Sequence, residues 1–444
     1  MMRRMHRNWL ATALLCCSGS NFNPLDAQDA IRAETASKSF WRAGTTVAAI
    51  NTLVWGFDRY VKDAQTARVG VRSWARNLVS GFEWDDNVFA TNQFAHPYHG
   101  SLYFSAARVN GYGFWGAAPF AAAGSLSWEL FAETNAPSFN DFVNTTLGGI
   151  ALGEVTHRIS HALLAGGPGL RRTVGALAVS PGSGLGRAVR ERDELLSRSF
   201  PASIRQEMTS GYGWLTDDGS RVSRPVLTMR IESGTPFDSG PGRPYEAFDV
   251  SLHLTGGERS IVSRLELNGV LGRRSVLRSE RGHLVITGVQ HYDYFNTSAF
   301  EWSAQSVSGG LAYRRDLSRQ LEFRVGTRLV GTVLGAISSE HAGVVGRTYD
   351  YGPGLGLATA GSLQYEGREL LKIERKSTWL HSVNGADAVH VARLTTVGLR
   401  IPARRLLNLG GEATVFSRTS RYAGLPRVDQ SVPQIRAYIV LGPR

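Results

Sequence analysis

The C-terminal half of the chain alternates apolar and polar residues with a period of two. The alternation is clear in residues 250–254, where valine and leucine alternate with serine and histidine. In residues 321–329 the apolar positions alternate with glutamate and arginine, and a similar pattern returns in residues 435–441. Because successive side chains of a strand point to opposite faces, these segments are predicted to be strands with one apolar face and one polar or charged face.

Between residue 226 and the C-terminus we count about eleven such segments, each about nine to fifteen residues long. Strands of soluble proteins usually have about 5–6 residues, whereas a strand that crosses a membrane at a tilt has about 9–11. The strands of a soluble β-sandwich also alternate apolar and polar residues, but that fold does not require arginine and glutamate to recur along long strands. The pattern therefore favours an antiparallel outer-membrane-type β-barrel of about 10–12 strands, with lipid outside and a wet lumen inside.

Residues 40–164 have the longer mixed apolar segments that are typical of helices. The stretch 44–57 is only fourteen residues long, and the stretch 114–132 is interrupted by Pro119 and contains Glu129. Neither offers the roughly 20 apolar residues of a membrane span, so both are predicted to pack in a bundle, with an interfacial helix as the alternative for the first. A turn-rich segment then puts a domain boundary near residue 200. The predicted fold class is α+β, a helical domain followed by the barrel.

The first thirty residues have the layout of a secretory signal peptide. Three arginines precede the apolar run 10–17, and a polar stretch follows it to residue 30. Cleavage after Ala27 gives a signal peptide over residues 1–27, a helical periplasmic or plug domain over 28–200 and a barrel over 201–444; a permanent anchor is the alternative. Both cysteines, Cys16 and Cys17, lie in the signal peptide. The mature chain is therefore expected to contain no disulfide and no thiolate metal site.

The net charge of +12 comes from dispersed arginine. Of the 49 basic residues only four are lysines, and no run of five or more basic residues occurs. Nucleic acid is therefore not an expected partner, whereas outer-membrane lipid is.

The chain has no Gly-x-Ser-x-Gly elbow, no phosphate-binding loop and no His-Glu-x-x-His motif. No cofactor is expected, and whether the protein holds a metal is left open.

The densest group of polar residues lies between residues 84 and 141. Pro97 suits the first turn of a helix, which puts His96 at the helix cap and His99 one turn later on the same side. The two imidazoles are predicted to be buried and bonded to backbone or carboxylate groups, and a metal pair or an acid–base pair is the alternative. A metal site made by His96, His99 and Glu129 is the corresponding third possibility for function.

Three further residues of this group are candidates for chemistry. Glu129 and Asp141 are either partners of histidine or Arg108 inside a packed bundle or catalytic carboxylates. Ser138 and Asp141 resemble a capping arrangement at the start of a helix. Farther along, Glu154 shares a helical face with two histidines, and this face is expected to be solvated rather than to bind zinc.

The same region resembles a known family. The motifs are Trp-Asp-Asp from residue 84, His-Pro-Tyr-His-Gly from residue 96, Ala-Ala-Arg from residue 106, Asn-Gly-Tyr from residue 110, Ser-x-x-Trp-Glu from residue 125, Pro-Ser-x-Asn-Asp from residue 137 and Gly-Glu from residue 153. In this order they resemble the bacterial domain of unknown function 3943, over about residues 84–154. The resemblance implies an exported envelope protein without an assigned activity, and it does not extend to the last two hundred residues.

The preferred hypothesis is an exported outer-membrane protein with a structural or transport-related barrel and a helical domain. The alternative is an envelope hydrolase acting on lipid or cell-wall material. In that hypothesis His96 or His99 is the base, Glu129 or Asp141 orients it, and Arg108 stabilises a developing anion. The sequence leaves open whether the protein is an enzyme.

Overall fold

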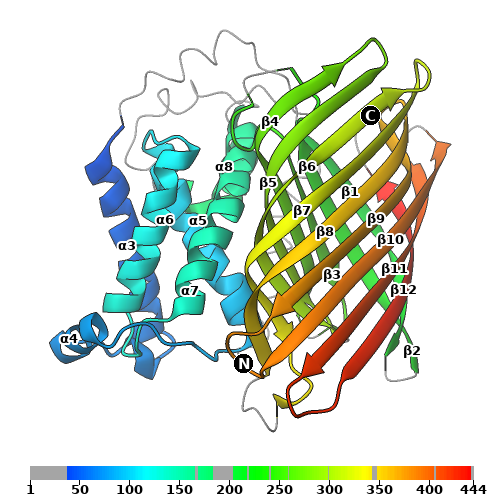
Figure 1. Cartoon of the computed structure of the whole chain (residues 1–444). Coiled ribbons are helices and arrows are strands. Elements are labelled where there is room, and N and C mark those ends of the chain that lie inside the picture. Colours follow the sequence, from blue (N-terminus) through cyan, green and yellow to red (C-terminus); the bar gives the residue numbers. More distant parts are fainter. Residues whose placement is uncertain are drawn as a thin grey trace. The chain divides into compact units, whose positions relative to one another are not determined.

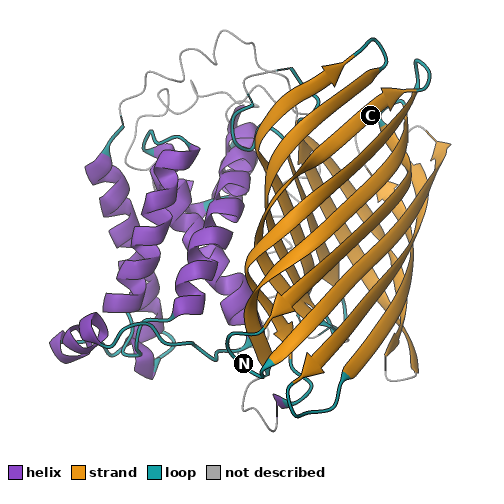
Figure 2. Ribbon diagram, in the orientation of Figure 1, coloured by secondary structure: helices purple, strands orange, loops and turns teal. Residues whose placement is uncertain are grey.

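The computed structural model describes residues 38–165, 169–183, 204–217, 220–239, 242–258, 260–298, 300–342, 348–404 and 407–441. The chain divides into a helical unit and a barrel unit, with the division between Ile204 and Arg205 (Figures 1 and 2). The predicted signal peptide and residues 184–203 of the predicted connector lie outside the described residues.

The described part of the helical unit contains seven α-helices. They are α3 (Phe40–Tyr60), α4 (Val71–Val79), α5 (His96–Val109), α6 (Phe114–Phe131), α7 (Phe139–Val143), α8 (Gly149–Ala165) and α9 (Leu170–Val179). The two longest predicted apolar segments are thus helices, and α6 continues through Pro119 rather than being interrupted by it. Within the described ranges, none of the helices combines the length and the apolar character needed to cross a membrane.

Two helices of this unit contain a π-turn. The segment Thr91–Ala95 (η3) leads directly into α5, and Asn144–Gly148 (η4) joins α7 to α8. His96 follows the first π-turn with helical backbone angles, so it lies inside a helix and not at a cap as predicted. The prediction failed because Pro97 is tolerated where a π-turn already disturbs the hydrogen-bond ladder. Such turns often occur at functional sites.

Helices α5 and α8 cross in close contact through glycines. A Cβ atom on Gly100 would lie 1.8 Å from the carbonyl oxygen of Thr145, and one on Gly149 would lie 2.6 Å from the Cα atom of Gly100. Only glycine fits at such an approach of two backbones. Beside this crossing, Tyr103 of α5 packs with Val47 and Ile50 of α3 in a buried apolar cluster.

The second unit is a closed antiparallel barrel of twelve strands. They are β1 (Ile204–Asp217), β2 (Ser220–Ser233), β3 (Phe248–Thr255), β4 (Val262–Arg278), β5 (Gly282–Asn296), β6 (Glu301–Asp316), β7 (Leu321–Ser338), β8 (Tyr349–Tyr365), β9 (Arg368–His381), β10 (Ala388–Arg404), β11 (Leu407–Tyr422) and β12 (Val428–Leu441). Each strand lies beside its sequence neighbours, and β1 pairs with β12, for example Tyr212 with Ala437, to close the barrel. The predicted antiparallel barrel of about 10–12 strands is confirmed.

The two faces of the strands differ as the alternation predicted. Leu329 is 72% exposed and Ile435 is 61% exposed, whereas Arg436 and Tyr438 are buried inside the barrel. The outward positions carry a broad set of exposed apolar side chains. They include Trp214, Phe323, Val325, Leu355, Leu357, Ile373, Trp379, Val397, Leu399, Ile401, Leu409, Val415, Ile439 and Leu441. An apolar exterior of this extent suits contact with lipid, and closure leaves no sheet edge unpaired.

Candidate functional site

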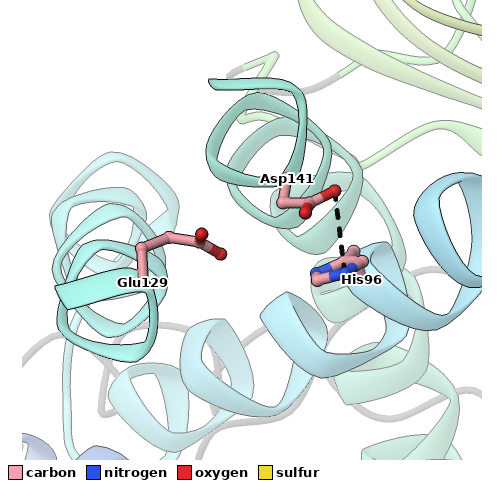
Figure 3. A group of neighbouring side chains, drawn as sticks. All are labelled: His96, Glu129 and Asp141. Carbon is pink, nitrogen blue, oxygen red and sulfur yellow. Dashed lines mark ion pairs between the residues drawn. The ribbon is translucent and has the colours of Figure 1, made fainter. Parts of the chain in front are cut away.

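Three side chains from three helices converge inside the helical unit (Figure 3). They are His96 at the start of α5, Glu129 near the end of α6 and Asp141 of α7. One nitrogen or oxygen atom from each lies within 4.8 Å of the others, and Nε2 of His96 is 3.6 Å from Oδ1 of Asp141. Both carboxylates are almost fully buried. The structure thus brings three of the five candidate residues together.

Each of the three side chains is oriented by a neighbour. Nδ1 of His96 lies 3.2 Å from the Thr145 hydroxyl, so a proton on Nδ1 would leave the lone pair of Nε2 facing the carboxylates. The Asn140 amide donates to Asp141 (2.9 Å), and the backbone N–H of Ser138 donates to Glu129 (2.8 Å). Ser138 also caps α7, because its hydroxyl accepts from the N–H of Asp141, and the predicted cap is confirmed.

The charge around Glu129 is mostly negative. Burial raises the pKa of Glu129 well above its usual value, and the carboxylates of Asp141 and Glu133 raise it further. The pKa of Glu133 is also raised, again mainly by burial, although His96 and a hydrogen bond from the Trp128 indole oppose this. The cluster therefore holds several carboxylates and a histidine in a site of low solvent access.

His99 faces a different part of the bundle. Its Nε2 lies 2.8 Å from the hydroxyl of Tyr103, and its ring packs edge-on against Trp128 at 4.8 Å. Burial, with a smaller contribution from His96, lowers the pKa of His99 to about 3. A histidine with such a pKa is neutral at physiological pH and is a weak general base. These contacts give His99 a packing role, with a tyrosine hydroxyl as its partner in place of the backbone or carboxylate group that the sequence predicted.

Arg108 is bound by Glu154. Its Nε donates to Glu154 (2.6 Å) and its Nη1 donates to the carbonyl oxygen of Tyr112 (2.6 Å), while Arg158 donates to the other oxygen of Glu154 (2.7 Å). Burial alone would raise the pKa of Glu154, but the two arginines hold it below its usual value.

The expectation of a solvated face around Glu154 is wrong. Glu154, Arg158 and the two histidines that share its face, His157 and His161, are all buried. The sequence pattern could not reveal this, because a buried ion-paired face and a solvated face contain the same residue types. The signal in the sequence that indicated burial of this face was Arg108, because a buried arginine needs an acidic partner such as Glu154.

The geometry of the cluster suits a divalent cation better than acid–base catalysis. Zinc holds its ligand atoms about 2.0–2.2 Å away, which in a tetrahedral site places them about 3.3–3.6 Å apart, so the three atoms, which lie within 4.8 Å of one another, would move closer together around an ion. Metal-binding histidines and carboxylates usually have such orienting hydrogen bonds. A hydroxyl–imidazole–carboxylate relay through Thr145 is less suitable, because Thr145 is buried and the 3.6 Å gap from His96 to Asp141 is too long for a hydrogen bond.

The barrel contains a second candidate site, a cavity of about 660 Å³ in the lumen. Charged residues of several strands line it, and the lining extends to the β8–β9 turn at Glu366 and Gly367 and to the first residues after β2. The charged lining residues are Arg205, Glu207, Arg230, Glu232, Asp249, Arg264, Glu266, Arg324, Arg328, Glu366, Arg368, Glu369, Lys372, Glu374, Lys376, Arg400 and Glu412. The cavity lies at the end of the barrel that holds these turns.

Ion pairs between residues that line this cavity cross the lumen. Nζ of Lys376 on β9 lies 2.6 Å from Glu266 on β4 and 3.4 Å from Asp293 on β5. Arg230 on β2 reaches Glu369 on β9 at 3.7 Å. Four strands separate β4 from β9, and four separate β2 from β9, on the shorter way round the barrel. These pairs therefore bridge opposite walls and narrow the lumen.

An apolar layer fills the lumen beyond the ion pairs. It consists of Phe295, Phe300, Trp302, Ala304, Ile337, Leu380, Ala392, Leu394, Phe416 and Val432. Phe295 of β5 packs edge-on against Phe416 of β11 at 5.6 Å, although these strands are not neighbours. None of the layer's residues lines the cavity. The sequence predicted a charged interior but missed this layer, since alternation identifies the inward face without saying which strands meet across the lumen.

Comparison with known proteins finds barrels among solved structures. The chain resembles the NanC porin (7% identity, TM-score 0.28, covering 53% of this chain and 100% of that one) and the KdgM porin (7%, 0.24, 53% and 99%). It also resembles the toluene transporter TodX of Pseudomonas putida (10%, 0.24, 56% and 91%). No curated protein matches the chain. Residues 81–181 match the family model described as a domain of unknown function (DUF3943), which confirms the resemblance predicted from the motifs.

Proposed function

We propose that the protein is an outer-membrane barrel that admits small polar or charged solutes to a chamber in its lumen and keeps the path beyond it closed. The observation that carries this proposal is the order of layers along the lumen. A cavity of about 660 Å³ is lined by charged residues whose ion pairs bridge the walls, and an apolar layer lies in the lumen beyond it. Hydrophobic constrictions of this kind can gate a channel by excluding water.

The proposed location and domain layout follow from the same features. The exposed apolar face of the barrel favours lipid as its surroundings, and a closed barrel of tilted strands is a form suited to the outer membrane. In this proposal residues 1–27 direct export, residues 28–200 form a periplasmic or plug domain and residues 201–444 form the barrel.

Conductance in planar bilayers tests the gate. Phe295→Ala combined with Phe416→Ala removes the ring pair that spans the lumen, and we expect at least a tenfold rise in single-channel conductance over the unaltered protein. Val415→Ala is the matched control, because Val415 precedes Phe416 and is exposed on the outside of the barrel. The proposal fails if the double variant keeps the heat-modifiable migration of a folded barrel and conducts no better than the control.

A second function is supported for the helical unit, the binding of one divalent cation of the zinc or manganese type. Its support is the convergence of one imidazole nitrogen and two carboxylates, each oriented by its own hydrogen bond. His96, Glu129 and Asp141 would be the ligands. Compared with the site suggested by the sequence, Asp141 takes the place of His99.

Elemental analysis of full-length protein purified without chelator tests the cation site. We expect about one equivalent of metal, lost in the Asp141→Asn variant and kept in Asp86→Asn, whose side chain is exposed in the same polar region. Substoichiometric metal in both the unaltered protein and the control, even after addition of zinc or manganese, contradicts the proposal.

The hydrolase alternative is supported by no comparable geometry, since His99 is a weak base and Arg108 is bound to Glu154.

A further inference from the structure

Helix α4 turns its apolar stripe away from the protein. Its apolar residues Val71, Trp74, Ala75, Leu78 and Val79 follow the spacing that normally marks the side of a helix packed on the core. Here all five are exposed, with Val71 at 76%, Leu78 at 60% and Val79 at 83%. The orientation of the helix is therefore the reverse of the usual one.

Polar contacts hold α4 in this orientation. Asn77 is the buried residue of the helix, and its amide donates to the carbonyl oxygens of Glu133 (2.9 Å) and Glu129 (3.3 Å) at the end of α6. Arg76 donates to the carbonyl oxygen of Thr134, and the Trp74 indole N–H donates to that of Phe131 (2.8 Å). The helix is thus attached through side-chain donors that include Trp74, while Val71, Leu78 and Val79 of its apolar stripe face outward.

The charged residues of α4 are both positive. The helix contains Arg72 and Arg76 and no acidic residue, whereas Arg68, which precedes it, is paired with Asp63 at 2.8 Å. Arg72 is exposed and has no ion pair in the described part of the chain. Phe82, one turn after the helix, is half exposed and extends the apolar surface. A short basic helix with an exposed apolar stripe fits a lipid surface, where apolar groups enter the acyl boundary and arginines meet phosphates.

We propose that α4 lies in the headgroup layer of an anionic phospholipid bilayer and attaches the helical unit to the membrane surface. The bilayer is preferred over a protein partner because of charge: α4 carries two cations, Arg72 and Arg76, and no acidic side chain, which matches a surface of phosphates. This attachment does not depend on conduction through the barrel or on the cation site, and it can be measured separately from both.

Fluorescent labels on single cysteines test the attachment in full-length protein reconstituted into vesicles of phosphatidylcholine and phosphatidylglycerol. Cys16 and Cys17 are replaced by serine, and the label is placed by Leu78→Cys, Val79→Cys or Ser80→Cys. Ser80 is exposed at the end of the same helix, on the side opposite Leu78, and serves as the matched control. We expect nitroxide lipids to quench labels at positions 78 and 79 at least threefold more than at 80, and Arg72→Glu to reduce this difference.

Two results would overturn the attachment to lipid. Equal quenching at all three positions by a water-soluble quencher, with little quenching by nitroxide lipid, would leave α4 in solvent. Protection of positions 78 and 79 that appears in detergent and grows with protein concentration would assign the stripe to a second copy of the chain. Heat-modifiable migration and a helical circular dichroism signal at 222 nm confirm that each labelled variant is folded.

Discussion

The interiors of the two units bury charge in opposite ways. In the barrel, acidic and basic side chains alternate across the lumen, so that Lys376 meets Glu266 and Arg400 meets Glu207 (2.7 Å). In the helical unit, the carboxylates of Glu129 and Asp141 share a site with one histidine. The acidic and basic side chains inside the barrel neutralise one another, whereas the helical cluster lacks a positive charge that a bound cation would supply.

The helical unit contains both arrangements within a short distance along the chain. Glu154 is fully buried but lies between Arg108 and Arg158, and its pKa is lowered. Glu129 is almost as buried but has other carboxylates as neighbours, and its pKa is raised. Burial alone therefore does not decide the state of a carboxylate here, since the charge of its neighbours reverses the outcome.

The largest expected effect comes from removing the charge of Glu154. Glu154→Gln leaves Arg108 and Arg158 buried without their anion, and breaking a buried ion pair from one side costs about 3–5 kcal/mol. We expect the thermal transition of the helical signal at 222 nm to fall accordingly. Asp63→Asn is the control, because its pair with Arg68 is exposed and such a pair contributes about 0–1 kcal/mol. Equal losses of stability in the two variants would contradict the claim that burial makes the Glu154 ion pairs contribute more to stability than the exposed pair of Asp63.

Acid should remove the same contribution. Because the pKa of Glu154 is lower in the folded state, its stabilisation is complete above the unfolded pKa of about 4.3 and is lost as the pH falls through the folded value. The unaltered protein is expected to lose stability below about pH 4.3 more steeply than Glu154→Gln. Parallel pH profiles of the two proteins, measured by the transition at 222 nm, would show that Glu154 is not the group responsible.

A smaller effect is expected at the crossing of α5 and α8. Gly100→Ala places a methyl group against the Thr145 carbonyl, and overpacking of this kind costs about 1–3 kcal/mol. Gly44→Ala in α3 is the control, because a Cβ there meets nothing within 4 Å and alanine is favoured over glycine in a helix by about 1 kcal/mol. The two substitutions should shift the midpoint of unfolding in opposite directions. Destabilisation by both would mean that the free volume at Gly44 is not the deciding factor.

The sequence predicted the barrel better than the site, for a physical reason. Strand alternation is local, so residues 321–329 reveal an apolar and a charged face without knowledge of other strands. The partners of Lys376 lie on β4 and β5, on the opposite wall of the barrel, and no local pattern specifies that pairing. In the helical unit, His96 and His99 look equivalent by spacing, yet the adjacent π-turn and the neighbouring helices give them different partners.

The smallest effect, and the one that separates the two kinds of buried carboxylate most directly, is expected for Glu129→Gln in metal-free protein. Glutamine still accepts from the N–H of Ser138, but it does not ionise, so it avoids the cost that the raised pKa of Glu129 imposes on folding at neutral pH. The substitution should therefore raise the midpoint of unfolding, opposite in sign to Glu154→Gln.

Addition of zinc or manganese should reverse this order, because the unaltered protein gains stability from the bound ion and the glutamine variant loses a ligand. The measurement is the midpoint at 222 nm with chelator and with each metal. If Glu129→Gln destabilises the metal-free protein as Glu154→Gln does, the carboxylate has a positive neighbour after all. The contrast between the two glutamates would then disappear, and with it the electrostatic reason for a cation at His96.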